Sequence, residues 1–249
     1  MTVDIHDSLR EQPPPLPVPA RALAVGAHPD DIEFGAGGTL ARWAAAGAEV
    51  TMLIVTDGSK GTWDPSMAPA RLAAIRKDEQ RRAAQKLGAA HVVHLDHVDG
   101  ELLYTMDLRA QICLQIRLHR PDVVFGHDPW KRYQLHPDHR AAGLGVVDGV
   151  VAARDHLFFP DQGVPAHRPG TLLLWSADEA DHYEDIATTF DKKVDALLCH
   201  SSQGTTTMGG ADSGGDPKEA FESRLRDHAA KLGELAGYEV AEAFKRIVP

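Results

Sequence analysis

The chain has 249 residues, of which 43% are hydrophobic and 25% are charged, and its formal net charge is −10. This length and composition are ordinary for a globular protein with a sizeable core. The acidic balance argues against nucleic-acid binding, which needs a basic surface. No apolar run approaches the ~20 residues that cross a bilayer. We therefore expect neither a nucleic acid nor a membrane as a partner.

The first 20 residues are polar and then proline-rich, with prolines at positions 13, 14, 15, 17 and 19. They lack the basic and apolar regions of a secretory signal peptide. We expect residues 1–20 to form an extended arm on the surface or on a neighbouring subunit, which would suit a homo-oligomer. Cys113 and Cys199 lie in helix-like segments, and we expect buried free thiols in a reducing compartment, the cytoplasm.

Strand-like and helix-like segments alternate as far as residue 154. Short apolar runs predict strands at 21–26, 49–56, 91–95 and 122–126. Amphipathic or alanine-rich segments predict helices at 32–46, 71–87, 108–119 and 137–154. This alternation predicts an α/β fold, a Rossmann-like, doubly wound and mostly parallel sheet in three layers.

The last hundred residues are less regular. The pattern predicts a loop at 160–170, a strand at 171–175, a helix at 188–199, a Gly/Ser/Thr-rich mobile loop at 201–216, a helix at 217–235 and a strand at 238–247. The sequence shows no internal repeat and no second domain. We therefore expect a single domain over residues 21–249.

Polar clusters follow three of the predicted strands. They are residues 28–31, residues 57–63 (whose Lys60 is a candidate for substrate binding) and residues 127–139. Ligands of open α/β sheets bind at the carboxyl ends of the strands. The three clusters are therefore predicted to meet at one edge of the sheet.

Two of these clusters carry residues that suit a metal site. His28, Asp31 and His139 would supply two imidazoles and one carboxylate, which leaves an open position as in catalytic zinc sites. Zinc lowers the pKa of a bound water toward about 7. Asp30 is placed to take a proton from that water. His136 could polarise a substrate carbonyl or protonate a leaving amine, and Asp138 could fix a histidine tautomer.

Other interpretations of these residues remain open. Asp31 alone could be a helix N-cap. Two histidines and one carboxylate also describe the Fe²⁺ centre of non-haem oxygenases, although those enzymes use an all-β scaffold, and the same ligands accept zinc or iron. A non-catalytic module that binds a sugar or a metal is the third hypothesis.

Further candidates carry less information. Arg76 and Glu79 are one helical turn apart, and a solvated ion pair is the favoured interpretation; the alternative is Arg76 binding a substrate hydroxyl or phosphate. His127 and Asp128 follow a strand and could line the pocket. His200 could approach the metal from the far side or be a buried or capping residue.

These motifs resemble a known family. Residues 27–31 (Ala-His-Pro-Asp-Asp) with Glu33, and the later His-Pro-Asp-His at 136–139, resemble the zinc-dependent de-N-acetylases of the PIG-L/LmbE-like family. The similarity extends to residues 56–62, 76–79, 87–88, Lys193 and 200–203, so that it covers about residues 20–205. One departure is Ile32, which separates Glu33 from the Asp-Asp pair.

The resemblance implies zinc on His28, Asp31 and His139, Asp30 as general base and His136 as the electrostatic or acid partner. It also implies a hydrolase that removes acetate from an N-acetylglucosamine (GlcNAc) conjugate, such as GlcNAc-inositol or GlcNAc-malate. In this reaction zinc-bound water attacks the amide carbonyl. The expected partner is a small amino-sugar conjugate.

Overall fold

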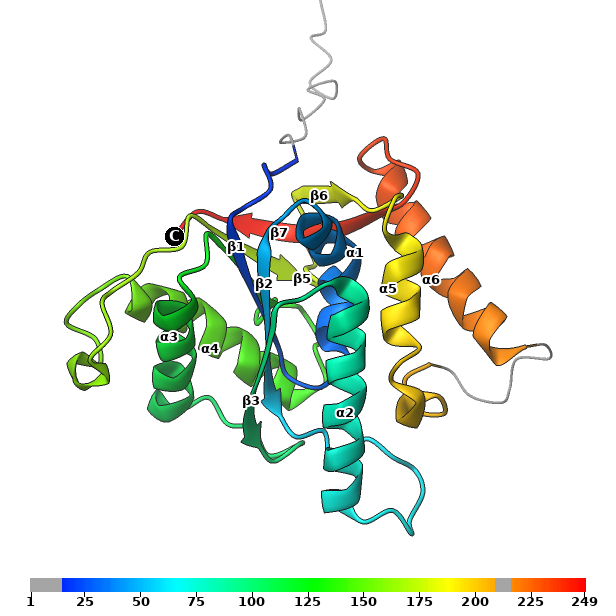
Figure 1. Cartoon of the computed structure of the whole chain (residues 1–249), viewed down its shortest axis with the longest axis horizontal. Helices are drawn as coiled ribbons and strands as arrows, with labels where there is room; N and C mark the ends of the chain where they lie inside the picture. The colour runs from blue at the N-terminus through cyan, green and yellow to red at the C-terminus, as the bar shows by residue number, and fades with distance from the viewer. Residues whose placement is uncertain (1–14, 209–215) are drawn as a thin grey trace, which may run out of the picture.

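A computed structural model describes residues 15–208 and 216–249, and Figure 1 shows the whole chain. Within the described residues, the strands form a 7-stranded sheet in the order β3-β2-β1-β4-β5-β7-β6. The strands are β1 (Arg21–Gly26), β2 (Glu49–Thr56), β3 (His91–His97), β4 (Val123–His127), β5 (Thr171–Trp175), β6 (His182–Asp185) and β7 (Ala241–Ile247). The helices are α1 (Asp31–Ala45), α2 (Pro69–Leu87), α3 (Met106–His119), α4 (Pro137–Ala153), α5 (Phe190–Leu197) and α6 (Pro217–Glu234).

The order in which the chain adds strands to the sheet reverses at β1. The chain builds β1, β2 and β3 outward in one direction, then crosses back so that β4 pairs with the other side of β1. Strands β1 to β5 are parallel, whereas β7 runs antiparallel to both β5 and β6. The predicted mostly parallel α/β fold is confirmed. The order of the strands thus reverses at the β1–β4 pair, and open α/β sheets bind ligands outside the carboxyl ends of the strands at such a point.

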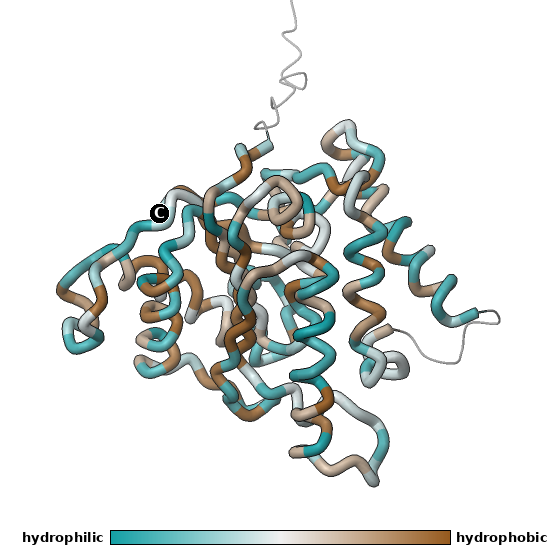
Figure 2. Tube along the Cα trace, viewed as in Figure 1, coloured by the Kyte–Doolittle hydropathy of each residue, from teal (hydrophilic) through white to brown (hydrophobic). Residues whose placement is uncertain are grey.

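Alternating strand residues fill two cores on opposite faces of the sheet. In β1, Ala22 and Ala24 belong to the core under α1 and α2, whereas Leu23 and Val25 belong to the core under α3 and α4. Figure 1 shows these helix pairs on the two sides of the sheet. The strands are accordingly the brown centre of Figure 2. Burial on both faces explains why β1 and β2 are nearly continuous apolar runs.

Most differences from the predicted elements lie at their ends. Helix α2 begins at Pro69, because proline suits the first helical turn. Helix α3 begins at Met106, and the Thr105 side chain caps it by accepting the Leu108 N–H. The sequence prediction missed β6, whose four residues His-Tyr-Glu-Asp give no apolar signal.

The structure describes only part of two predicted segments, the proline-rich arm at 1–20 and the loop at 201–216. Of the proline-rich arm, Leu16 is buried and its N–H donates to Glu184 Oε1 at 3.1 Å, while residues 1–14 are outside the description. Of the 201–216 segment, Ser201–Gln203 form a 3-10 helix and residues 209–215 are outside the description.

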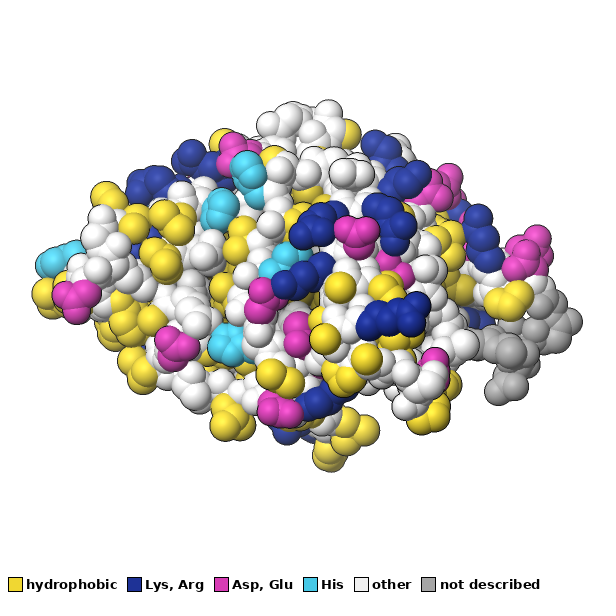
Figure 3. Space-filling view, turned by 60° about the horizontal axis from the view of Figure 1, so that its bottom comes forward, with side chains coloured by type: hydrophobic (Ala, Val, Ile, Leu, Met, Phe, Trp, Pro, Cys, Tyr) yellow, Lys and Arg dark blue, Asp and Glu magenta, His cyan; other side chains and the backbone are white. Residues whose placement is uncertain are grey.

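Three further features of the structure are the state of its cysteines, the hydropathy of its helices and the distribution of charge on its surface. Cys113 and Cys199 are both free thiols as predicted, although Cys199 is only partly buried. No helix in the described ranges is long and apolar enough to span a membrane. Basic and acidic side chains are interspersed on the face turned forward in Figure 3.

Candidate metal centre

Asp31 lies at the centre of the site, directly after β1. Its Oδ2 is 3.3 Å from Nδ1 of His28, and its Oδ1 is 3.3 Å from Nε2 of His139. His139 reaches this point from the first turn of α4, because β4 pairs with β1. Ligand atoms about 2.0–2.2 Å from one tetrahedral ion lie roughly 3.3–3.5 Å apart. Each of the two histidines therefore lies at such a distance from Asp31, through a different carboxylate oxygen, although the three predicted ligands are not together in any one of the donor groups found among the described residues.

More than three donor side chains gather around this point. Among the described residues, three overlapping groups have donor atoms within 4.8 Å of one another: His28, His136 and His139; Asp31, His127 and His139; and His28, Asp99 and Asp138. Distance alone therefore does not select the ligands. The hydrogen bond at the second ring nitrogen of each histidine does, because it decides which nitrogen keeps a lone pair.

His28 presents Nδ1 to the centre because two carboxylates hold its Nε2. Nε2 lies 3.2 Å from Asp99 Oδ1 and 3.2 Å from Asp138 Oδ2, so the ring proton belongs on Nε2. Burial alone would lower the pKa of His28, but hydrogen bonds to Asp138, Asp31 and Asp99 raise it well above its usual value. The same carboxylates favour a positive charge here, whether it is a proton or a metal cation.

Asp138 and Asp99 are themselves held by backbone amides. Asp138 is fully buried and accepts the N–H groups of Gly100 at 2.7 Å and Leu102 at 3.2 Å. Asp99 accepts the Lys60 N–H at 3.0 Å. Burial would raise the pKa of Asp99, but its hydrogen bond to His28 and the charge of that ring lower it to about 2. Asp138 thus acts on the tautomer of His28.

His127 is assigned the same Nε2–H tautomer as His28, but it turns the protonated nitrogen toward Asp31. The Trp175 indole N–H donates to its Nδ1 at 3.0 Å, so the proton of neutral His127 belongs on Nε2, which lies 3.2 Å from Asp31 Oδ2. The Ala27 N–H also lies 3.3 Å from Nε2, and a neutral ring can accept only one of these two donors. We assign the proton to Nε2 because the indole contact is the shorter one and because the Asp31 carboxylate beside Nε2 is an acceptor. His127 is buried, and burial lowers its pKa. It therefore supports Asp31 by a hydrogen bond and does not present a ligand lone pair.

Asp30 is held in place by α2. Its backbone is left-handed (φ 101°), its N–H donates to Gln80 Oε1 at 3.1 Å, and its Oδ2 lies 3.4 Å from Arg76 Nη2. A positive φ is costly for a residue other than glycine and indicates a conformation that the surroundings impose. Burial raises the pKa of Asp30 to about 6, although the Arg76 charge opposes the shift. A carboxyl group whose pKa is near 6 can both accept and return a proton at neutral pH.

The predicted solvated pair of Arg76 and Glu79 is wrong. Arg76 is only 3% exposed and donates to the Gly58 carbonyl at 3.1 Å as well as to the Pro29 carbonyl. Glu79 is 1% exposed and accepts the Ser201 hydroxyl at 2.9 Å, with further bonds from Ser202. Helical spacing was the only signal in the sequence, but tertiary packing directs the two side chains to different partners.

His136 caps α4 and faces the other two histidines. Its Nδ1 accepts the Asp138 N–H at 3.3 Å, so Nε2 carries the proton of the neutral ring. Its ring centroid lies 4.5 Å from that of His28 and 4.7 Å from that of His139. Burial, then the charges of His28 and His139, lower its pKa. Neutral His136 is therefore a hydrogen-bond donor rather than an acid.

The remaining predicted residues are Lys60, Asp128 and His200, and their contacts are with groups other than Asp31. Lys60 is exposed and pairs with Glu101 at 2.6 Å. The Asp128 carboxylate accepts the Trp130 N–H at 2.9 Å and so closes a turn in the β4–α4 loop. His200 is fully buried, with Nε2 3.5 Å from Glu33 Oε1, as in the second of its two predicted alternatives and not in the first, an approach to the metal.

The sequence prediction missed Asp99, Gln80 and Trp175. Asp99 could have been found, because it follows β3 at the same edge as the other polar clusters. Gln80 and Trp175 lie within a helix and a strand, where polar or aromatic residues give no signal of their own.

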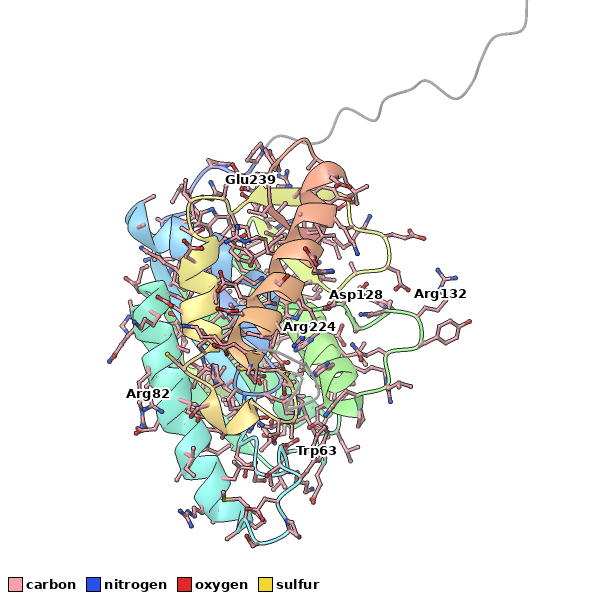
Figure 4. The ribbon with its side chains drawn as sticks, turned by 90° about the vertical axis from the view of Figure 1, so that its right-hand side faces the viewer. Trp63, Arg82, Asp128, Arg132, Arg224 and Glu239 are labelled. Atoms are coloured by element: carbon pink, nitrogen blue, oxygen red, sulfur yellow. The ribbon has the colours of Figure 1, made fainter. Side chains whose placement is uncertain are left out.

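A cavity of about 720 Å³ adjoins the centre on the β4, β5 and β7 side. Asp31, His127, His139 and Trp175 line its inner end. Farther out it passes between α1, the loop after β5, and α6. In Figure 4, α6 with Arg224 lies beside the loop of Asp128 and Arg132, while Trp63 projects from a separate loop at the lower end.

The fold and the site define an α/β enzyme whose histidine and aspartate side chains could bind a metal at the carboxyl ends of a mostly parallel sheet. The family model described as PIG-L, GlcNAc-PI de-N-acetylase, matches residues 23–150. The chain belongs to this family, as the sequence motifs predicted. It is a deacetylase, an amide hydrolase that acts on N-acetyl groups.

Individual relatives agree. The diacetylchitobiose deacetylase of Thermococcus kodakarensis is 33% identical over 232 residues, which cover 92% of this chain and 83% of the relative. A 1D-myo-inositol 2-acetamido-2-deoxy-alpha-D-glucopyranoside deacetylase of Rhodococcus opacus is 34% identical over 66% of this chain and 63% of its own. The structure of N,N'-diacetylchitobiose deacetylase from Pyrococcus horikoshii with its inhibitor MPG superposes with a TM-score of 0.84, at 31% identity over 92% of this chain and 84% of that one.

Proposed function

We propose that the chain removes acetate from a small GlcNAc conjugate at a metal ion held by His28, Asp31 and His139. The observation that carries the proposal is the pair of 3.3 Å contacts that place imidazole nitrogens of His28 and His139 at the two oxygens of Asp31. The histidine tautomers support the same set, since His28 keeps its lone pair on Nδ1 and His127 does not face Asp31 with one. Zinc is the proposed metal, and the ligands also suit Fe²⁺.

When bound, the cation would polarise the amide carbonyl and lower the pKa of a water molecule. Asp30 takes one proton from the attacking water as its oxygen bonds to the carbonyl carbon. The Nε2–H of His136 donates to the carbonyl oxygen as negative charge develops there. Asp30 then returns its proton to the amine nitrogen as the C–N bond breaks, which yields acetate and a free amine. A pKa of about 6 suits Asp30 to both transfers.

The polar groups on the β2 and β3 side suit the sugar. Arg76 and Asp99 are buried beside Asp30 and His28, on the same side of the centre as the exposed Lys60. Guanidinium and carboxylate groups bind sugar hydroxyls by directional hydrogen bonds. The free thiols support a cytoplasmic site of action. The oxygenase alternative is not favoured, because the scaffold is α/β and its relatives are deacetylases.

Acetate release by the zinc-loaded protein tests the proposal. The substrates are diacetylchitobiose, GlcNAc-inositol, GlcNAc-malate and free GlcNAc. We expect one conjugate to be hydrolysed much faster than the free sugar, and we expect Asp30→Asn to lower that activity by about 10²–10⁴-fold while the metal stays bound. Equal turnover by wild type and Asp30→Asn would reject the mechanism. No acetate from any conjugate, with metal bound, would reject the substrate class.

A further inference from the structure

The cavity beside Asp31 is too large for an acetyl group. Its volume is about 720 Å³, within the roughly 300–1,000 Å³ of pockets that enclose whole small molecules. An acetyl group adds a single methyl beyond the carbonyl carbon. The cavity therefore holds space that the removal of acetate does not use.

The topology divides the site into two sides. The centre lies at the β1–β4 pair. Arg76 and Asp99 come from the β2–β3 side, and the cavity lies over β4, β5 and β7. The acyl carbon and the nitrogen are roughly 120° apart at the planar carbonyl carbon of an amide, so the acyl arm and the amine arm leave it in different directions. The hydroxyl-rich sugar arm matches Arg76 and Asp99, which leaves the cavity to the acyl arm.

The cavity wall is chemically suited to an apolar chain. Phe34, Trp175, Leu225 and Leu232 line it, together with alanines from β7 and α6. Charged and titratable side chains line it as well: Lys193 and Glu242 pair at 2.6 Å, and Lys131, Asp178 and His228 also contribute. An acyl chain packed against the apolar side chains of this wall would leave water.

We propose that the cavity binds the acyl arm, and that the enzyme hydrolyses N-acyl amino sugars whose linear acyl chains are longer than acetyl. The inference rests on the proposed deacetylase function and extends it to a second substrate class. The reaction is the same: water adds its oxygen to the carbonyl carbon, the C–N bond breaks, and the amine takes the proton. The product is a longer carboxylate, such as butyrate or hexanoate, in place of acetate.

Cavity-filling variants test the inference. Leu232→Trp and Ala243→Phe place bulk in the wall from α6 and β7, away from Asp31. Glu234→Trp is the matched control, because it puts the same ring on the exposed side of α6. The rate of amine release is measured as kcat/KM for N-acetyl, N-butyryl and N-hexanoyl forms of whichever sugar conjugate the wild type deacetylates.

We expect the wild type to hydrolyse all three within about tenfold of one another. Each filling variant should lower kcat/KM for the hexanoyl form on the order of tenfold or more, because lost apolar contacts have effects of that size. The ratio of hexanoyl to acetyl kcat/KM should fall by the same factor, and Glu234→Trp should leave all three unchanged. Acetyl turnover with no measurable hexanoyl turnover would overturn the inference, as would variants that slow every chain length equally.

A binding measurement separates this inference from the deacetylase function. If no conjugate is hydrolysed, acetate and hexanoate are titrated into the metal-loaded protein and followed by saturation-transfer NMR. Tighter binding of hexanoate that Leu232→Trp removes would support the cavity assignment even though the proposed function had failed. Equal binding of the two carboxylates, or binding that the filling variants do not alter, would overturn it.

Discussion

Glu242→Gln is predicted to destabilise the fold because it breaks a buried network of charge. The Glu242 carboxylate accepts the N–H groups of Gly38 at 2.9 Å and Thr39 at 2.8 Å, the Thr39 hydroxyl at 2.6 Å, and Lys193 at 2.6 Å. Among the described residues, the Lys193 ammonium has one other hydrogen-bond partner, the Phe34 carbonyl at 2.8 Å. The network ties β7 to α1 and α5, beside the metal centre.

The size of the effect follows from these partners. Glutamine has one acceptor oxygen, so its amide N–H₂ must face either the Gly38 and Lys193 donors or the Thr39 donors. At least one buried backbone N–H then loses its acceptor, which costs about 1–3 kcal/mol. The Lys193 charge also loses its counter-charge, and breaking a buried pair costs roughly 3–5 kcal/mol in all. We expect the free energy of unfolding to fall by about that total.

Urea unfolding at fixed metal concentration measures the change. The chain provides a matched control, since Lys60–Glu101 has the same 2.6 Å separation but side chains that are 48% and 65% exposed, against 8% and 3% for Lys193–Glu242. Glu101→Gln should therefore cost less than about 1 kcal/mol. The double variant Lys193→Met/Glu242→Gln should be more stable than Glu242→Gln alone, because it removes the unpaired charge. Similar losses for Glu101→Gln and Glu242→Gln would refute the reasoning.

Four further predictions concern the metal centre. Asp30→Asn should keep the metal but lower kcat by about 10²–10⁴-fold, and near-normal turnover would remove Asp30 as the base. Because the base form of Asp30 exists above its pKa of about 6, wild-type kcat/KM should fall as the pH drops through or below 6. An acidic decrease in kcat/KM that is already half complete above pH 7.5 would contradict this assignment. A chelator should abolish deacetylation and added Zn²⁺ should restore it, whereas full activity of metal-free protein would exclude the centre. Trp175→Phe removes the donor to His127, so metal affinity in chelator competition should weaken about tenfold, and an unchanged affinity would show that the tautomer of His127 is unimportant.

The fold was largely predictable because its strands carry a strong signal. Buried parallel strands such as β2 are apolar on both faces, and helices with alanine-rich sequences separate them. The antiparallel end of the sheet gave a weaker signal. β6 has four residues, two of them acidic, and it pairs only with β7 at the edge of the sheet. Its place depends on tertiary contacts such as the buried pair of His182 and Glu184, which lie 2.7 Å apart.

The position of the site was also predictable, but the role of each side chain was only partly so. Chain connectivity places His28 and His139 at neighbouring strand ends, and the rule for open α/β sheets locates that edge. The partners of Arg76 could not be read from the sequence, because a helix shows its neighbours at i+3 and i+4 but not the loops that pack on it. Arg76 binds the carbonyl groups of Gly58 and Pro29, from two such loops.

Neither sequence spacing nor proximity distinguishes a ligand histidine from a supporting one at this centre. His28 and His127 approach the same oxygen of Asp31, at 3.3 Å and 3.2 Å. What separates them is the partner of the distant ring nitrogen. Carboxylates accept a hydrogen bond from the Nε2–H of His28, which leaves the lone pair on its Nδ1. In contrast, the Trp175 indole donates to Nδ1 of His127, so the proton of that ring is assigned to the nitrogen that faces Asp31. The identity of residues 99 and 175, distant in sequence from both histidines, therefore decides which imidazole can bind a metal.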